Sequence, residues 1–221
     1  MTHLEEELKQ LKAAVVKMTA LAISQLIKAK EAYLNMDTEI AHELNHNEKR
    51  INAMELAIDS DCENIFALFN PVATDLRFVI AVLKINSDLE RIGDAADGIA
   101  DYVVDLNKPM NSEIIKATKI TDMFDISISM AQDIKIAIEN DDNSLARKVY
   151  KKDVELNKIN RNSSQVISDF VKNDPGIINQ SLYLFATIRK LERVGDHIKN
   201  IAEDLIFFVE AKVYKRKSKI K

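Results

Sequence analysis

The sequence predicts an all-α fold in which six long antiparallel helices form two tandem, pseudo-symmetric three-helix bundles. Tryptophan is absent, proline occurs only three times in 221 residues, and 47% of the residues are hydrophobic, as in proteins built from long amphipathic helices. Asn, Asp, Pro and Gly interrupt the chain at regular intervals. The stretch LERIGD at 89–94 also returns as LERVGD at 191–196, which indicates that the second half repeats the first.

Five breaks separate the six predicted helices. Every break contains Asn or Asp, which cap helices and form turns, and all three prolines lie at breaks. The segments between the breaks are about 30 residues long, so each forms a helix of about 45 Å, and their short connections make consecutive helices antiparallel. The breaks are Asn35–Asp37, Asn70–Pro71, Asn107–Pro109, Asn140–Asn143 and Asp174–Gly176.

Apolar residues recur with helical spacing inside these segments, and no segment shows the sustained alternation that is typical of a β-strand. The spacing is clearest in the first and the last segment. We therefore predict helices within residues 1–34, 38–69, 72–106, 110–139, 144–173 and from 177 onward.

The repeat divides the chain into residues 1–106, the first bundle, and residues 107–221, the second bundle with a basic C-terminal tail. The likeness extends to the second helix of each half. There an acid followed by Asn one turn later lies 42 or 39 residues before the motif glutamate: Glu48 and Asn52 in the first half, Asp153 and Asn157 in the second.

Charge and cysteine content narrow the class of protein. The net charge is −4, and six basic side chains lie within residues 212–221, so the remainder carries −10. An acidic body argues against a nucleic-acid partner, whereas the tail suits lipid headgroups, an acidic partner or solvent. The single cysteine, Cys62, suits a buried core position in a reducing compartment. Because no apolar run of about 18 residues and no leader-like segment occurs, we expect a cytoplasmic protein.

The repeated motif supplies candidate metal ligands. Each copy places a Glu and an Asp one helical turn apart, and in the simplest bundle this pair faces the acid of the second helix. Three carboxylates and an Asn oxygen repel one another unless a cation joins them, and such all-oxygen sets suit Mg²⁺, Ca²⁺, Mn²⁺ or iron. The six candidate ligands are Glu48, Glu90, Asp94, Asp153, Glu192 and Asp196.

Gly93 and Gly195 separate the two acids of each pair, although glycine in a helix costs about 1 kcal/mol relative to alanine. A glycine permits close approach of a ligand or a helix, which favours metal binding over the alternative, a surface salt-bridge network with Arg91 and Arg193. A continuing polar stripe extends the candidate site: Asp97 and Asp101 in the first half, Asn200 and Glu203 in the second. Glu55 and Asp59 are further candidates, although the second half has Asn160 and Ser164 in their places. His197 is an alternative second-half ligand, but we favour an exposed or core position for it.

Two further motifs suggest metal sites, but the rest of the sequence does not support either of them. His42, Glu43 and His46 fit the HExxH zinc motif, but the second half has no counterpart and no strands are predicted. The two Glu-x-x-His stretches at 39–42 and 43–46 lie on one helix, whereas di-iron bundles need them on two. Because no phosphate-binding loop, nucleophile elbow or Cys/His pair occurs, we predict a docking protein and not an enzyme.

The chain resembles the PhoU family of phosphate-signalling proteins over essentially its whole length. The resemblance is carried by MELAID at 54–59, NPVATDLR at 70–77, LERIGD at 89–94 and LERVGDH at 191–197 followed by NIAE at 200–203. It implies a fold of two three-helix bundles with pseudo-twofold symmetry. It also implies a cytoplasmic negative regulator of the phosphate regulon.

The resemblance implies two partners. PhoU proteins are thought to link the ATPase subunit of the high-affinity phosphate ABC transporter to a membrane sensor histidine kinase. When phosphate is plentiful, this link favours the repressed kinase and restrains uptake. We therefore expect membrane association only through these partners, no nucleic acid, and a homodimer.

Some members of the family bind multinuclear iron or other divalent metals through an E(D)xxxD signature. In this chain the signature falls on the acids of both LERxGD copies, with Glu48 and Asp153 as the second-helix partners. Asn52 and Asn157 stand where a second acid completes the partner motif, which is a departure from the family pattern. The expected metal is Fe, Mn, Mg or Zn, and the alternative function is a metal-handling bundle without a signalling role.

Overall fold

The computed structural model describes residues 2–210, which form helices and no β-strand. The all-α prediction is therefore confirmed for this part of the chain, and the basic tail at 212–221 lies outside it. The elements in chain order are α1 (His3–Asn35), α2 (Thr38–Phe69), α3 (Ala73–Leu106), α4 (Ser112–Thr118), α5 (Ile120–Asn140), α6 (Asn143–Asn173), a 3₁₀ helix (Pro175–Ile177) and α7 (Ile178–Glu210).

The predicted breaks contain the helix caps. Asp37 and Asp142 precede α2 and α6, and the side-chain oxygen of each accepts hydrogen bonds from two backbone N–H groups of the first turn. Asn111 caps α4 in the same way, two residues beyond the predicted break at Asn107–Pro109. Asn70 and Asp141 end α2 and α5 with φ of 48° and 52°. Asn and Asp tolerate this left-handed conformation better than most other residues with a side chain.

The prediction of six long helices is wrong in the fourth segment. Lys119 has a φ of 57° and separates the seven-residue α4 from α5. Ile114 and Ile120, on either side of this break, are both buried. They would lie about 120° apart around a continuous helix, so the break allows both side chains to reach the core.

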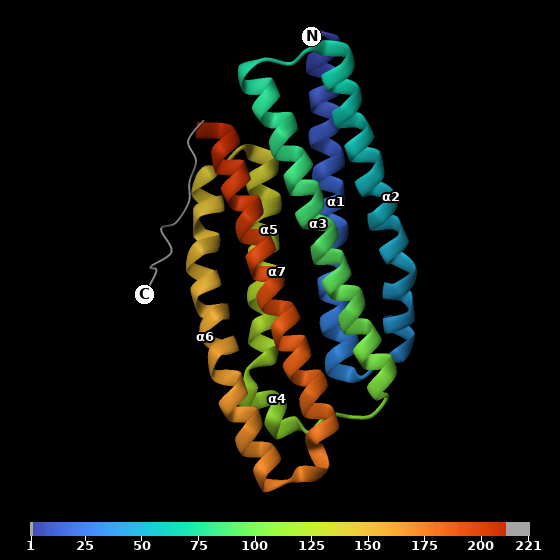
Figure 1. Ribbon diagram of the computed structural model, residues 1–221, viewed down its shortest axis with the longest axis vertical. Coiled ribbons are helices and arrows are strands. Elements are labelled where there is room, and N and C mark those ends of the chain that lie inside the picture. Colours follow the sequence, from blue (N-terminus) through green and yellow to red (C-terminus); the bar gives the residue numbers. More distant parts are fainter. Residues whose placement is uncertain (1, 211–221) are drawn as a thin grey trace.

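Two bundles lie side by side (Figure 1). Helices α1, α2 and α3 form one, and α5, α6 and α7 form the other, with α4 at one end. In the middle of the molecule α3 packs against α7 and runs in the opposite direction, and α1 packs against α5. The buried apolar side chains of both bundles belong to one continuous core. The halves are therefore joined by a hydrophobic interface as well as by the chain.

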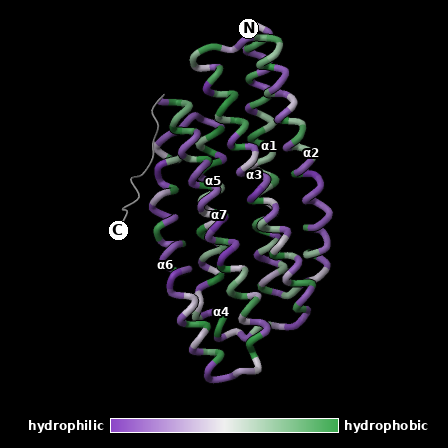
Figure 2. Tube along the Cα trace, in the orientation of Figure 1, coloured by the Kyte–Doolittle hydropathy of each residue, from purple (hydrophilic) through white to green (hydrophobic). Residues whose placement is uncertain are grey.

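Hydropathy follows this arrangement. Figure 2 shows hydrophilic residues along much of the outer helices α2 and α6. Helix α1 is long and apolar enough to cross a membrane by length and composition, but Leu11, Met18 and Leu26 on it are buried against the other helices. Cys62 is buried as predicted, and burial together with neighbouring acids raises the pKa of its thiol to about 12.

Candidate functional site

The repeated glycines are explained by helix packing. A Cβ atom built on Gly93 lies 2.5 Å from Cδ1 of Ile51, and a Cβ atom built on Gly195 collides with Leu156 in the same way. Each glycine is thus a notch that admits a large side chain from the second helix of its bundle. Helix packing therefore explains the glycines without a ligand, and they no longer favour metal binding over the salt-bridge alternative.

These notches also fix how the helices face each other. Ile51 of α2 fits against α3 as Leu156 of α6 fits against α7, so the two bundles share one register. The six candidate ligands consequently fall into two sets on pseudo-equivalent pairs of helices. We call the polar surface between α2 and α3 the α2–α3 seam, and its members are Asn45, Glu48, Asn52, Glu55, Asp59, Asn86, Glu90, Asp94, Asp97 and Asp101. The α6–α7 seam consists of Asp153, Asn157, Glu192, Asp196 and Lys199.

Asparagine amides hold the ends of the α2–α3 seam. The amide of Asn45 donates to Asp97 at 2.7 Å and to Asp101 at 3.1 Å. At the other end the amide of Asn86 donates to Asp59 at 2.9 Å. Between them Asn52 donates to the Glu48 carboxylate on its own helix. Neutral donors thus satisfy acids at both ends of the seam without reducing its negative charge.

In the ion pairs of the α2–α3 seam, the positive charge comes from Arg91. Its guanidinium lies 3.4 Å from Glu90 and 3.6 Å from Asp94, and 58% of its side chain is exposed. This arrangement agrees with the salt-bridge alternative for these two acids. An exposed pair of this kind contributes little, about 0–1 kcal/mol, so it leaves most of the repulsion in the seam in place.

The pKa values in the α2–α3 seam show this repulsion. Burial and the Asp94 carboxylate raise the pKa of Glu90 to about 7, although Arg91 opposes the shift. Burial also raises the pKa of Glu55, with Asp59 adding to it. For Asp97, burial again raises the pKa, the hydrogen bond from Asn45 opposes it, and neighbouring carboxylates add to it. Desolvated, mutually repelling carboxylates are groups that a cation stabilises.

The α6–α7 seam has a different electrostatic arrangement. Lys199 hydrogen-bonds Asp196, and its ammonium lies 3.5 Å from the carboxylate of Asp153, a residue that is only 6% exposed. Burial disfavours the charged ammonium, but the hydrogen bond and the two acids outweigh it and raise the pKa of Lys199. Arg189 lies 3.6 Å from Glu192. Each predicted acid of this seam therefore has a protein cation beside it.

The fit to a metal differs between the seams. Among residues 2–210, no three His, Cys, Asp or Glu side chains converge closely enough to hold a metal ion as they stand. In the α2–α3 seam, however, the side-chain oxygens of Asn52 and Asn86 are buried without a hydrogen-bond partner in the described chain. Carboxylates beside such amide oxygens are the chemistry that a hard cation prefers, so a cation could be held in the α2–α3 seam if its side chains moved together, whereas the α6–α7 seam already contains an ammonium.

The HExxH stretch is not a metal site in this fold. His42 and His46 are exposed on α2, and Glu43 forms an ion pair with Lys28 of α1. The stretch serves the fold through Asn45, whose amide binds the acids of α3.

The partners of His197 and Lys199 were not predicted from the sequence. The imidazole of His197 lies 2.7 Å from Asp88, so it joins α7 to α3 across the two bundles and does not belong to the second set of acids. Lys84 binds Asp204 at 3.0 Å across the same interface. Lys199 was overlooked, although its position three residues after Asp196 is the signal that predicts their contact.

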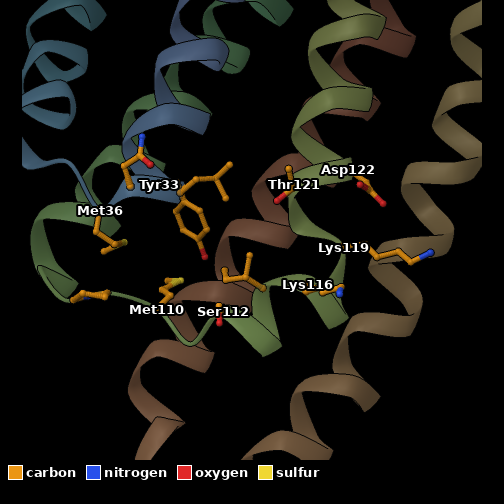
Figure 3. A pocket seen from close by; sticks show the side chains of 12 residues that line it. Tyr33, Met36, Met110, Ser112, Lys116, Lys119, Thr121 and Asp122 are labelled. Atoms are coloured by element: carbon orange, nitrogen blue, oxygen red, sulfur yellow. The ribbon is translucent and has the colours of Figure 1, made fainter.

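Two hollows lie near these elements. The copies of the motif approach each other in a polar hollow of about 210 Å³ lined by Arg91, Asp94, Ala95, Lys190, Arg193 and His197. A second cavity, of about 550 Å³, lies where the α1–α2 turn meets the loop before α4 (Figure 3). Its wall includes Tyr33 and Met110, and the amines of Lys116 and Lys119 point away from the tyrosine ring.

Comparison with known proteins identifies relatives over both halves. The PhoU domain model matches residues 15–103 and again 120–205. The phosphate-specific transport system accessory protein PhoU homolog of Aquifex aeolicus is 32% identical, covering 95% of this chain and 94% of the relative. PhoU homolog 1 of Thermotoga maritima is 30% identical, covering 95% and 90%.

Solved structures agree with the sequence comparison. The crystal structure of PhoU from Pseudomonas aeruginosa superposes with a TM-score of 0.88 at 29% identity, covering 94% of this chain and 99% of the other. The phosphate transport system regulatory protein PhoU from Streptococcus pneumoniae gives a TM-score of 0.87 at 28% identity, covering 97% and 100%. The whole helical arrangement is therefore shared with these proteins.

Proposed function

The chain belongs to the PhoU family, and from this premise we propose that it is a negative regulator of phosphate uptake and of the phosphate regulon. Its relatives are named as accessory proteins of phosphate-specific transport, and a role in regulating phosphate transport follows for this chain. The observation that carries the proposal is the match over both halves in sequence and in fold. Consistent with this role, the protein acts by docking and not by catalysis.

The proposed partners are the ATPase subunit of the phosphate ABC transporter and a sensor histidine kinase. Exposed apolar side chains support docking: Leu68 and Val72, at the turn between α2 and α3, are 71% and 72% exposed. Such side chains are typical of contact surfaces when they gather in one place. A cytoplasmic location, a homodimer and membrane contact through these partners alone belong to the same proposal.

Binding to the ATPase tests the regulatory role directly. Tagged protein, purified from its own host, should retain the transporter ATPase, and deletion of the gene should raise phosphate uptake when phosphate is plentiful. A Leu68→Asp/Val72→Asp variant should lose the ATPase while keeping its helical circular dichroism, and Leu56→Asp, an exposed apolar residue elsewhere on α2, serves as the matched control. Unchanged uptake after deletion would contradict the proposal.

Metal binding through the acids of the repeated motif is a separate part of the proposal. It is supported by the raised pKa of Glu90 and by the free amide oxygens of the α2–α3 seam. A divalent cation there would bind oxygens of α2 and α3 together and neutralise their charge. Elemental analysis of protein purified without chelator should find iron, manganese, zinc or magnesium, which a Glu90→Gln/Glu192→Gln variant loses. Equal metal in both proteins would refute the assignment of these acids.

A further inference from the structure

We propose that the two seams have different occupants: a divalent cation in the α2–α3 seam and the ammonium of Lys199 in the α6–α7 seam. The inference rests on the metal-binding part of the proposed function and restricts it to the first bundle. It makes Lys199 the residue that decides which of the two copies of the motif takes up metal.

The shared register places Lys199 where the first bundle has Asp97. LERIGD and LERVGD start 102 residues apart, and the same interval separates Asp97 from Lys199. The glycine notches show that this alignment also holds in space, since Gly93 receives Ile51 and Gly195 receives Leu156. A carboxylate in one bundle is thus replaced by an ammonium at the equivalent position of the other.

The neighbours of these two residues match as well. Glu48 and Asp94 are close enough to Asp97 to raise its pKa. Their counterparts, Asp153 and Asp196, are the two acids that the ammonium of Lys199 contacts. Lys199 therefore lies among the acids that would otherwise surround a cation, and it supplies a positive charge that is covalently attached.

Two further positions, on the second helix of each bundle, diverge in the same direction. Glu55 and Asp59 of α2 correspond to Asn160 and Ser164 of α6, so the second bundle has fewer acids to neutralise. Glu192 already has Arg189 beside it. A metal ion entering the α6–α7 seam would have to displace an ammonium that is covalently attached to the helix and already lies 3.5 Å from the buried Asp153 carboxylate.

The α2–α3 seam, by contrast, contains buried amide oxygens that a cation would satisfy. Asn86 is fully buried, its amide nitrogen binds Asp59, and its side-chain oxygen has no hydrogen-bond partner in the described chain. The side-chain oxygen of Asn52 is also buried without a partner there. A buried acceptor without a donor is costly, and a hard cation satisfies such an oxygen together with the nearby carboxylates.

Metal stoichiometry tests the asymmetry. Chelator-treated protein is titrated with Mn²⁺, and bound manganese is measured by electron paramagnetic resonance and by elemental analysis after gel filtration. The variant Glu90→Gln/Asp94→Asn should weaken Mn²⁺ binding more than about tenfold, whereas the matched variant Glu192→Gln/Asp196→Asn should bind as wild type does. Equal losses in the two variants would overturn the proposal, because both seams would then hold metal.

A substitution at Lys199 provides the converse experiment. Lys199→Asp removes the ammonium and restores the acid of the first bundle, so it should bind additional Mn²⁺ that Glu192→Gln/Asp196→Asn abolishes. Lys172→Asp, on an exposed residue of the same bundle, adds the same charge and should add no bound manganese. If Lys199→Asp binds no more manganese than wild type, Lys199 is not what excludes metal.

The ammonium half of the proposal has a readout that needs no metal. In chelator-treated protein Lys199→Met should lower the Tm by roughly 5 °C, because the buried Asp153 loses the ammonium of Lys199. Asp97→Asn should raise the Tm, because it removes a repelling charge. Wild-type protein without affinity for Mn²⁺ would overturn the cation half and the metal part of the proposed function, while binding of the ATPase would still decide the regulatory part. An unchanged Tm in Lys199→Met would overturn the ammonium half.

Discussion

The α2–α3 seam and the α6–α7 seam have the same packing and different electrostatics. In both, a glycine of the third helix of the bundle receives a large aliphatic side chain from the second helix. Around this contact the first bundle gathers acids, asparagines and one exposed arginine. The second places a lysine between its acids. The shared feature is therefore the apolar contact, and the polar residues beside it have diverged.

This difference shows that the glycine of the repeated motif indicates how the helices pack, whereas its carboxylates indicate what the seam binds. The notch is favoured in both copies because a Cβ atom at either glycine would meet the end of Ile51 or Leu156, and that side chain would then have to move. The carboxylates are under no such steric constraint, and each needs only a positive charge or a donor nearby. A repeat such as LERxGD therefore predicts the packing of both bundles but does not predict the same ligand in both.

The largest effect should come from truncating the side chains that fill the two glycine notches. Ile51→Ala and Leu156→Ala each remove a buried side chain, and each should cost about 2–4 kcal/mol of the free energy of unfolding, measured by urea denaturation. Similar losses would confirm that the two bundles share the same packing. A loss below about 1 kcal/mol in either variant would mean that its glycine does not serve packing.

The next largest effect should be a difference between the seams in how stability depends on pH, which arises from the titration of Glu90. Because its pKa is raised from 4.5 to about 7 in the folded protein, the folded state holds this proton more tightly than the unfolded chain does. The stability that this provides is complete below about pH 4.5 and is lost as the pH rises through about 7.

In chelator-treated protein at pH 8, Glu90→Gln should therefore stabilise the fold by about 1 kcal/mol, and the gain should vanish toward pH 4. The groups that face Glu90 are Asp94, Arg91 and Glu55. Glu192→Gln loses the contact with the exposed Arg189 and should change stability by less than about 0.5 kcal/mol. Parallel pH profiles of the two variants in thermal denaturation would contradict the electrostatic difference between the seams.

The smallest effect should distinguish the two notches from each other. Alanine gains about 1 kcal/mol over glycine in a helix, but Gly93→Ala must displace Ile51, whose branched Cβ makes it stiff. Gly93→Ala should therefore be destabilising by about 1 kcal/mol, whereas Gly195→Ala, which meets the flexible end of Leu156, should be nearly neutral. Chemical denaturation of both variants measures the difference, and the reverse order would show that Leu156 is the more constrained side chain.

Local signals predicted most of the fold because helix ends depend on neighbouring residues. Asp37 and Asp142, which lie at predicted breaks, cap their helices through their own side chains, and such residues are visible in the sequence. The break at Lys119 has no such signal, since lysine does not favour a left-handed conformation. It forms because Ile114 and Ile120 both reach the core, and that requirement arises only when the other helices are in place.

The sequence by itself determined the helices, their division by a repeated motif, the family, and the acids that the motif carries. Only the tertiary structure decided which groups of a neighbouring helix the polar residues meet: Asn45 of α2 beside Asp97 of α3 in one bundle, and Lys199 of α7 beside Asp153 of α6 in the other. The reason is physical. Helix formation and capping depend on residues a few positions apart, whereas the charge state and ligand of a carboxylate depend on every group within a few ångströms, including those brought near by other helices.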